Sequence, residues 1–153
     1  MKKLTPFLIS TLLVFGVAAC DNASKTSESA PNNPNEAPQS PTVQTTEASQ
    51  KDAQSETRRR QLDSDIRARE QRNNTTGGDA DRAKGDLASE VRSKLEANIP
   101  KSQLTVDATK DGVVTVGGTV NNQQELAKIE RLAKEIKGVK SVVVKTTVAP
   151  PTR

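Results

Sequence analysis

The stretch LTVDATKDGVVTVGGTV, residues 104–120, decides the fold because it places two alternating apolar runs on either side of a turn signal. Apolar and polar residues alternate from Leu104 to Ala108, and apolar or small residues alternate with polar ones from Val114 to Val120. Alternation with a period of two is typical of a strand with one buried face. Asp111-Gly112 favours a tight primed hairpin, because both residue types tolerate positive φ angles. The stretch therefore predicts two adjacent antiparallel strands.

Helical patterns flank this hairpin on both sides. Apolar residues recur every four positions before it and predict a helix from about Asp81 to Asn98, ended by Pro100. After the hairpin, a capping box at Asn122–Glu125 predicts a second helix that reaches about Ile136.

A last apolar run from Val139 to Val148 predicts a third strand. The order α-β-β-α-β predicts a small α+β domain over residues 79–149, with a three-stranded sheet and two helices on one face, followed by a tail at 150–153. If the second and third strands are parallel, the helix between them forms a right-handed crossover.

The N-terminus has the form of a secretory signal. Met1-Lys2-Lys3 is positively charged, an apolar run follows, and small residues precede Cys20. Val17-Ala18-Ala19-Cys20 resembles the bacterial lipobox, which implies cleavage after residue 19 and acylation (palmitate) of Cys20. Two or three acyl chains would hold the chain firmly to a bilayer. The alternative is an ordinary secreted protein with a spare cysteine.

Composition restricts the functions open to the chain. Phe7 and Phe15 are the two aromatic residues, so none remains once residues 1–19 are removed. This argues against base stacking on single-stranded nucleic acid and against aromatic anchoring in a bilayer. The chain has no histidine, which is the usual general base and the commonest metal ligand, and it has one cysteine. We therefore expect no enzyme activity, no metal, no cofactor and no nucleic-acid partner.

The composition of residues 20–78 predicts a disordered linker that begins at the lipidated cysteine. Ser, Thr, Pro, Asn and Gln dominate its first half, and such a composition buries too little apolar surface to offset the entropy of ordering. A coil of residues 21–82 would reach about 40–50 Å. Its segment 58–72 carries six arginines and three acidic residues. That segment is either a basic cluster that touches anionic headgroups or, as we favour, a solvated, salt-bridged helix or coil.

The predicted domain resembles a BON domain, the small envelope module of osmotic-shock-induced periplasmic proteins. The resemblance rests on the helix around Leu87–Leu95, the hairpin with Asp111-Gly112, and a strand-Gly-x-Val, helix, Gly-Val-x-x-Val succession, which is carried here by Gly118, Val120, Gly138, Val139 and Val142. It implies a non-catalytic envelope protein that attaches to membranes, binds anionic phospholipid in some members and supports the envelope under stress. This chain has one such unit where periplasmic relatives often have two.

The resemblance suggests where lipid would bind. Without aromatic side chains, contact with headgroups has to be electrostatic and shallow. The first candidates are Arg92, Lys94 and Lys101, and the second choice is Lys140 and Lys145; the alternative is a mixed-charge solvated surface. We expect Gly112, Gly118 and Gly138 to have structural roles, with Gly118 allowing close packing of a helix on the sheet.

The sequence therefore favours an envelope lipoprotein that faces the periplasm and makes peripheral contacts with anionic phospholipid or an envelope protein. Asp21 after the cysteine slightly favours the inner membrane, and the outer membrane is the alternative. The other function left open is a protein-interaction module that docks a partner by an exposed sheet face or edge strand, without lipid specificity.

Overall fold

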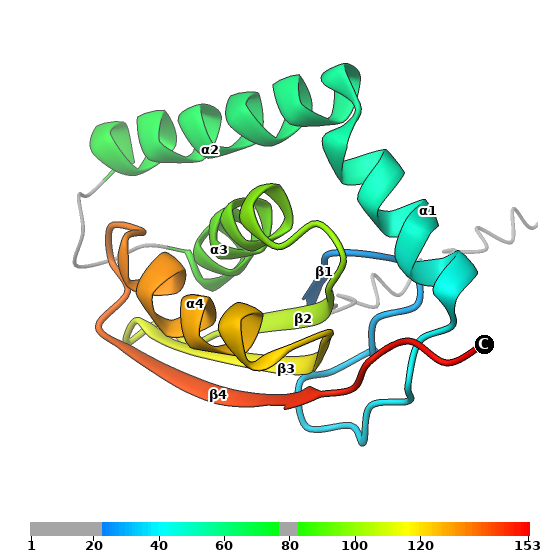
Figure 1. Cartoon of the computed structure of the whole chain (residues 1–153). Coiled ribbons are helices and arrows are strands. Elements are labelled where there is room, and N and C mark those ends of the chain that lie inside the picture. The colour runs from blue at the N-terminus through cyan, green and yellow to red at the C-terminus, as the bar shows by residue number, and fades with distance from the viewer. Residues whose placement is uncertain (1–22, 77–82) are drawn as a thin grey trace, which may run out of the picture.

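A computed structural model describes residues 23–76 and 83–153, in which two helices cover one face of a single mixed sheet (Figure 1). The signal segment and Cys20 lie outside the described residues, as do residues 77–78 of the predicted linker and 79–82 of the predicted domain. The elements are β1 (Ser24–Lys25), α1 (Val43–Gln54), α2 (Glu56–Thr76), α3 (Lys84–Asn98), β2 (Gln103–Ala108), β3 (Val113–Val120), α4 (Gln123–Lys134) and β4 (Ser141–Val148).

The sheet has the order β1-β2-β3-β4. Strands β2 and β3 are antiparallel, with Val106 opposite Val116, and β3 and β4 are parallel, with Val116 opposite Val144. Helix α4 connects the parallel pair, which confirms the α+β class and the predicted α-β-β-α-β order from α3 to β4.

The expectation of three strands was wrong, because a fourth strand is added at the free edge of β2. Ser24 and Lys25 pair with Val106 and Thr105, and the backbone N–H of Thr26 donates to the carbonyl of Leu104 at 2.9 Å. A strand of two residues has no readable apolar alternation. What favours it is the row of backbone donors and acceptors that β2 would otherwise leave open.

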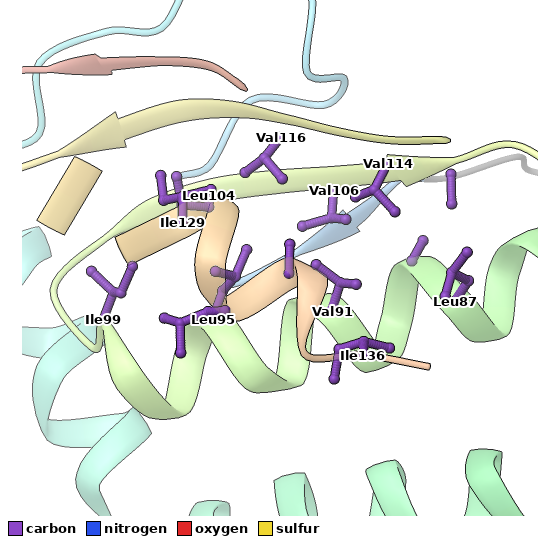
Figure 2. Packing of buried hydrophobic residues seen from close by; sticks show 14 of the residues in the cluster. Leu87, Val91, Leu95, Ile99, Leu104, Val106, Val114, Val116, Ile129 and Ile136 are labelled. Atoms are coloured by element: carbon purple, nitrogen blue, oxygen red, sulfur yellow. The ribbon is translucent and has the colours of Figure 1, made fainter. Parts of the chain in front are cut away.

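The hydrophobic core lies between the sheet and helices α3 and α4 (Figure 2). The stripe predicted for α3 packs against the inner face of β2 and β3. Its members Val91 and Leu95 have no exposed surface, and neither have Val106 and Val116 on the strands. Helix α4 adds Ile129 from its own stripe.

The loop between β2 and β3 differs from the predicted primed turn. Gly112 has a φ of 80°, whereas no non-glycine residue among the described ones has positive φ, so Asp111 does not take the conformation that a primed turn requires. The N–H of Gly112 donates to the carbonyl of Thr109 at 3.1 Å, and the N–H of Thr109 donates to the carbonyl of Val113 at 2.9 Å. The connection is thus a wider loop over 109–112 that needs positive φ only at the glycine.

Residues 23–42 differ from the expected disordered linker, because they cross the sheet face opposite to α3 and α4 (Figure 1). The hydroxyl of Thr105 on β2 donates to the carbonyl of Pro31. The backbone of Pro34 lies so close to Gly117 that a Cβ there would be 2.1 Å from the Pro34 carbonyl oxygen. Polar side chains on the outer face of the sheet bind this segment, and this pairing supplies the stabilisation that its own composition lacks.

Residues 43–76 also differ from the expected linker, because they form two helices. Thr42 caps α1 by accepting a hydrogen bond from the N–H of Thr45. Helix α2 then lies over α3 on the side that faces away from the sheet (Figure 1). Leu62 of α2 is 2% exposed, although it lies outside the main core cluster.

Gly118 offers a test of the strand geometry. Its φ is 108°, and a Cβ would lie 2.0 Å from the carbonyl oxygen of Gln103 on β2, so the close neighbour is strand backbone and not, as expected, a helix. Gly118→Ala should therefore lower the free energy of unfolding by about 2–4 kcal/mol. Gly85→Ala is the matched control: a Cβ there meets nothing within 4 Å, and the change should stabilise α3 by up to about 1 kcal/mol. Urea denaturation measures both, and equal effects of the two variants would contradict this description.

Candidate functional site: the α2–α3 interface and the lysine end

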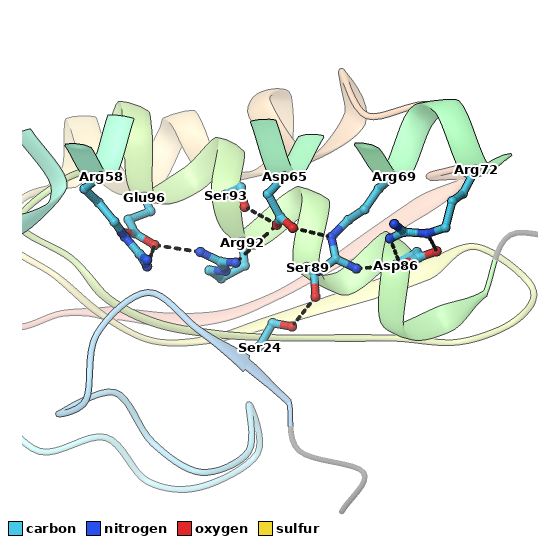
Figure 3. A network of polar contacts seen from close by, with 10 residues as sticks. All are labelled: Ser24, Arg58, Asp65, Arg69, Arg72, Asp86, Ser89, Arg92, Ser93 and Glu96. Carbon is cyan, nitrogen blue, oxygen red and sulfur yellow. Dashed lines mark hydrogen bonds and ion pairs between the residues drawn. The ribbon is translucent and has the colours of Figure 1, made fainter. Parts of the chain in front are cut away.

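Helix α2 is attached to α3 mainly by charged side chains (Figure 3). It carries six arginines and four acidic residues, and Leu62 is its one fully buried large apolar side chain. The helices run antiparallel: Arg58 near the start of α2 meets Glu96 near the end of α3, and Arg72 near the end of α2 meets Asp86 near the start of α3. We call this set of contacts the ionic interface.

Glu96 lies at one end of the ionic interface and is 2% exposed. Arg58 donates to its two oxygens through Nε at 2.6 Å and through Nη2 at 3.0 Å, and Arg92 donates through Nη1 at 3.0 Å. Two guanidinium groups thus surround one buried carboxylate. Such a carboxylate is costly to bury unless it is paired in this way, so α2 contributes the Arg58 half of that pairing.

Asp65 of α2 lies at the middle of the interface. It accepts hydrogen bonds from Ser93 at 3.0 Å, from Arg69 at 2.9 Å and from Arg92 at 3.4 Å. Burial alone would raise the pKa of Asp65, but the hydrogen bonds from Arg69 and Ser93 outweigh burial and hold the pKa below its ordinary value.

Asp86 marks the other end of the interface. Arg72 donates to it through Nη2 at 2.8 Å, and Arg69 contacts the same oxygen. The hydrogen bond from Arg72 lowers the pKa of Asp86, burial opposes it, and Arg69 adds to the lowering. One turn further along α3, Ser89 is hydrogen-bonded to Ser24 of β1 at 3.2 Å, so β1 and α2 contact the same helix (Figure 3).

The ionic interface shows how the arginines of segment 58–72 are used. Arg58, Arg69 and Arg72 face carboxylates of α3, and Arg60 forms an ion pair with Glu56 on the exposed side of α2. The segment is therefore a salt-bridged helix, the interpretation favoured from the sequence. Sequence reasoning missed the partner helix, although opposite charges on α2 and α3 at matching spacing were a readable signal.

The structure places the three residues of the first predicted headgroup group in three different surroundings. Arg92 is 16% exposed and is bound to Asp65 and Glu96 under α2. Lys94 lies 2.9 Å from Glu135 of α4. Lys101 is half-buried and lines a cavity of about 280 Å³ together with Asn121, Glu125 and residues of α1 that include Glu47. These three side chains do not form one exposed basic patch.

The second group of predicted residues lies on β4 and directly before it. Lys145 is exposed, and its Nζ donates to Asn35 in the segment that crosses the outer sheet face. Lys140 precedes β4, and its backbone N–H donates to the carbonyl of Gly112 at 2.8 Å. This bond joins the 109–112 loop to the corner between α4 and β4, where Gly138 has a φ of 93°.

The joined loop and corner bring three exposed lysines to one end of the sheet: Lys110, Lys137 and Lys140. We call this end the lysine end. The acidic residues nearest in the chain, Asp107, Asp111 and Glu135, are exposed as well, and Glu135 is paired with Lys94 and Arg131. No ion pair involving Lys110 or Lys140 occurs among the described residues. Sequence reasoning named Lys140 as a candidate and did not name the other two, because only the fold places the loop beside the corner.

The lowered pKa values of Asp65 and Asp86 predict how α2 responds to acid. Their stabilising effect is complete above the ordinary value of 3.8 and is lost as pH falls through the lowered pKa values. Amide hydrogen exchange, corrected for its intrinsic pH dependence, should show α2 protected at pH 5 to 7 and losing protection below about pH 4, before β3 does. Asp86→Asn should weaken protection of α2 at pH 7, whereas Glu130→Gln, which removes a surface pair on α4, should not. Simultaneous loss of protection in α2 and β3 would contradict a separately attached helix.

Comparisons with known proteins agree with the domain seen from α3 to β4. The BON domain family matches residues 83–150. Osmotically-inducible protein Y of Escherichia coli (strain K12) is 44% identical over 62 residues, which cover 38% of this chain and 30% of that protein. The match thus spans less than a third of that relative's length, and no solved structure matches the chain. The chain therefore carries a BON domain over residues 83–150.

Proposed function

We propose that the chain is a non-catalytic envelope lipoprotein, anchored through acylated Cys20, whose BON domain contacts anionic phospholipid headgroups and supports the envelope under osmotic stress. The observation that carries this proposal is the short spacing between the lipobox cysteine and the sheet. Strand β1 begins at Ser24, four residues after Cys20.

This spacing limits the height of the domain above the bilayer. Four residues span at most about 14 Å, since an extended chain advances by up to about 3.6 Å per residue. The domain would therefore lie next to the headgroup layer, not at the end of the 40–50 Å reach expected for a disordered linker. None of the described helices is long and apolar enough to cross a bilayer.

The direction of β1 orients the domain. Because β1 is antiparallel to β2, the N-terminal end of β1 points toward the 109–112 loop. The anchor would thus bring the lysine end toward the membrane, where each basic residue near an anionic surface contributes about 1 kcal/mol. The proposal accordingly moves the headgroup contact from Arg92, Lys94 and Lys101 to Lys110, Lys137 and Lys140.

The family and the relative support the setting of this function. A BON domain and a match to a protein named for osmotic induction favour the envelope and a stress response for this chain. Asp21 favours the inner membrane slightly, and the outer membrane is the alternative location.

A protein-interaction module is the second candidate, and one observation favours it. Strand β4 forms an edge of the sheet, and no other strand in the described residues pairs with its outer side. Val143, Val144 and Val148 on it are 41%, 37% and 38% exposed. An extended segment of another protein could pair with such an edge. The outer sheet face is less suitable, because residues 23–42 cross it.

Replacement of the cysteine tests the anchor. Cys20→Ser should move the protein from the membrane fraction to the soluble fraction, or leave uncut precursor, because the acceptor for lipid is gone. Detergent-phase partitioning of cells that express either form measures this. Partitioning at the wild-type level would rule out the lipid anchor.

Replacement of lysines tests the headgroup contact. Lys110→Gln with Lys140→Gln should weaken binding of residues 20–153 with Cys20→Ser to phosphatidylglycerol vesicles by about 2 kcal/mol, or roughly thirtyfold. Lys128→Gln with Lys145→Gln removes the same charge elsewhere and should have a smaller effect. Vesicle sedimentation at low salt gives the affinities.

The same measurement separates the two candidate functions. Equal loss in both double variants would mean that net charge alone matters and would contradict a contact at the lysine end. Failure of the parent chain to bind anionic vesicles, combined with salt-insensitive capture of a protein that Val144→Lys abolishes, would favour docking at the β4 edge.

A further inference from the structure

Helix α2 is held to the BON domain by contacts that another anion could replace. Its arginines at the interface bind two carboxylates of α3, Glu96 and Asp86, and its own Asp65 binds Arg92 and Ser93 of α3. Asp65 and Asp86 are only partly buried, with side chains 27% and 26% exposed. Partly exposed ion pairs contribute about 0.2–1 kcal/mol each and weaken as ions compete. Leu62, which is fully buried, and half-buried Ile66 are the large apolar side chains of α2, and the other contacts named here are charged or polar.

We propose that α2 is an exchangeable cover of α3, and that an anionic phospholipid surface releases it by taking over Arg58, Arg69 and Arg72 from Glu96 and Asp86 of α3. This inference rests on the proposed function, because it requires the domain to lie at the membrane. It assigns α2, which lies outside the BON domain, a part in binding that membrane.

The position of α2 favours a lipid surface as the competitor. The C-terminal end of α2, with Arg69 and Arg72, lies over the start of α3. Helix α3 runs antiparallel to β2, so its start lies at the same end of the domain as the 109–112 loop. The part of the ionic interface with the most exposed arginine is thus the part nearest to the proposed membrane contact; the Arg72 side chain is 53% exposed.

The charges of α2 suit a membrane surface once it is released. Arg59 and Arg67 are already exposed, and release would add the three arginines that now face α3. Phosphate oxygens accept bidentate hydrogen bonds from guanidinium as carboxylates do, so the released arginines have equivalent acceptors. The helix has too few large apolar residues to insert, so it would lie among the headgroups and not in the hydrocarbon.

Release of α2 has a direct reporter in Ser93. This residue of α3 has no exposed surface and donates to Asp65 of α2. In residues 20–153 with Cys20→Ser, the change Ser93→Cys supplies a single thiol that maleimide reaches only when α2 has left. Ser102→Cys is the matched control: Ser102 is 2% exposed and is hydrogen-bonded to Ile99 where α3 turns toward β2, with Thr26 on its carbonyl.

The experiment compares labelling rates at low salt with phosphatidylglycerol vesicles and with phosphatidylcholine vesicles, and follows binding by sedimentation. We expect the Ser93→Cys thiol to react at least tenfold faster on the anionic vesicles and the Ser102→Cys thiol to keep its rate. Asp86→Asn should increase the acceleration at Ser93 more than Asp111→Asn does, although both remove one negative charge. Slow labelling with phosphatidylcholine verifies that Ser93→Cys is folded.

Each other outcome contradicts the inference in a distinct way. Binding to anionic vesicles with an unchanged rate at Ser93 would overturn the release of α2 and leave the proposed function intact. Equal acceleration at Ser93 and Ser102 would mean that the whole domain opens. Absence of binding would overturn both the proposed lipid contact and the release.

Discussion

The pairing of Glu96 with Arg58 and Arg92 is the constraint on which the arrangement of the N-terminal half depends. A carboxylate that is 2% exposed requires compensation, and Arg92 on the same helix supplies only part of it. Arg58 supplies the rest, at 2.6 Å and 3.0 Å, and thereby fixes where α2 begins on α3. Asp65 and Asp86 extend the same charge pairing along both helices. Helix α2 therefore lies alongside α3 over its length, although it has almost no apolar stripe.

This arrangement changes what the BON domain can present to its surroundings. In the described residues, α2 covers the outer side of α3, residues 23–42 cross the outer face of the sheet, and β1 occupies the edge of β2. The lysine end and the β4 edge are among the surfaces that these segments leave uncovered. The two surfaces differ chemically, since one carries exposed lysines and the other carries three exposed valines. The proposed anchor at Cys20 favours the lysine end, because β1 points toward it.

The sequence predicted the part of the fold whose residues are patterned by apolar burial. The period of four in α3, the alternation in β2 and β3 and the capping box of α4 all lead to the observed elements. It did not predict β1, α1 or the packing of α2 on α3, because polar pairing with the domain holds these segments in place. The candidate residues show the same division: Lys140 was named from the sequence, whereas Lys110 and Lys137 join it only because the backbone of Lys140 is hydrogen-bonded to Gly112. Arg92 was expected on a free surface, since no pattern in α3 itself indicates a second helix above it.

A double-mutant cycle on Arg58 and Glu96 tests the central claim most directly. The quantity to measure is the free energy of opening of α2, obtained from amide hydrogen exchange in the parent, Arg58→Gln, Glu96→Gln and the double variant. A docked α2 predicts a coupling energy of about 1–3 kcal/mol between the two residues. A coupling energy of zero, with α2 exchanging as an unprotected peptide in all four proteins, would show that residues 56–76 form the disordered linker first expected.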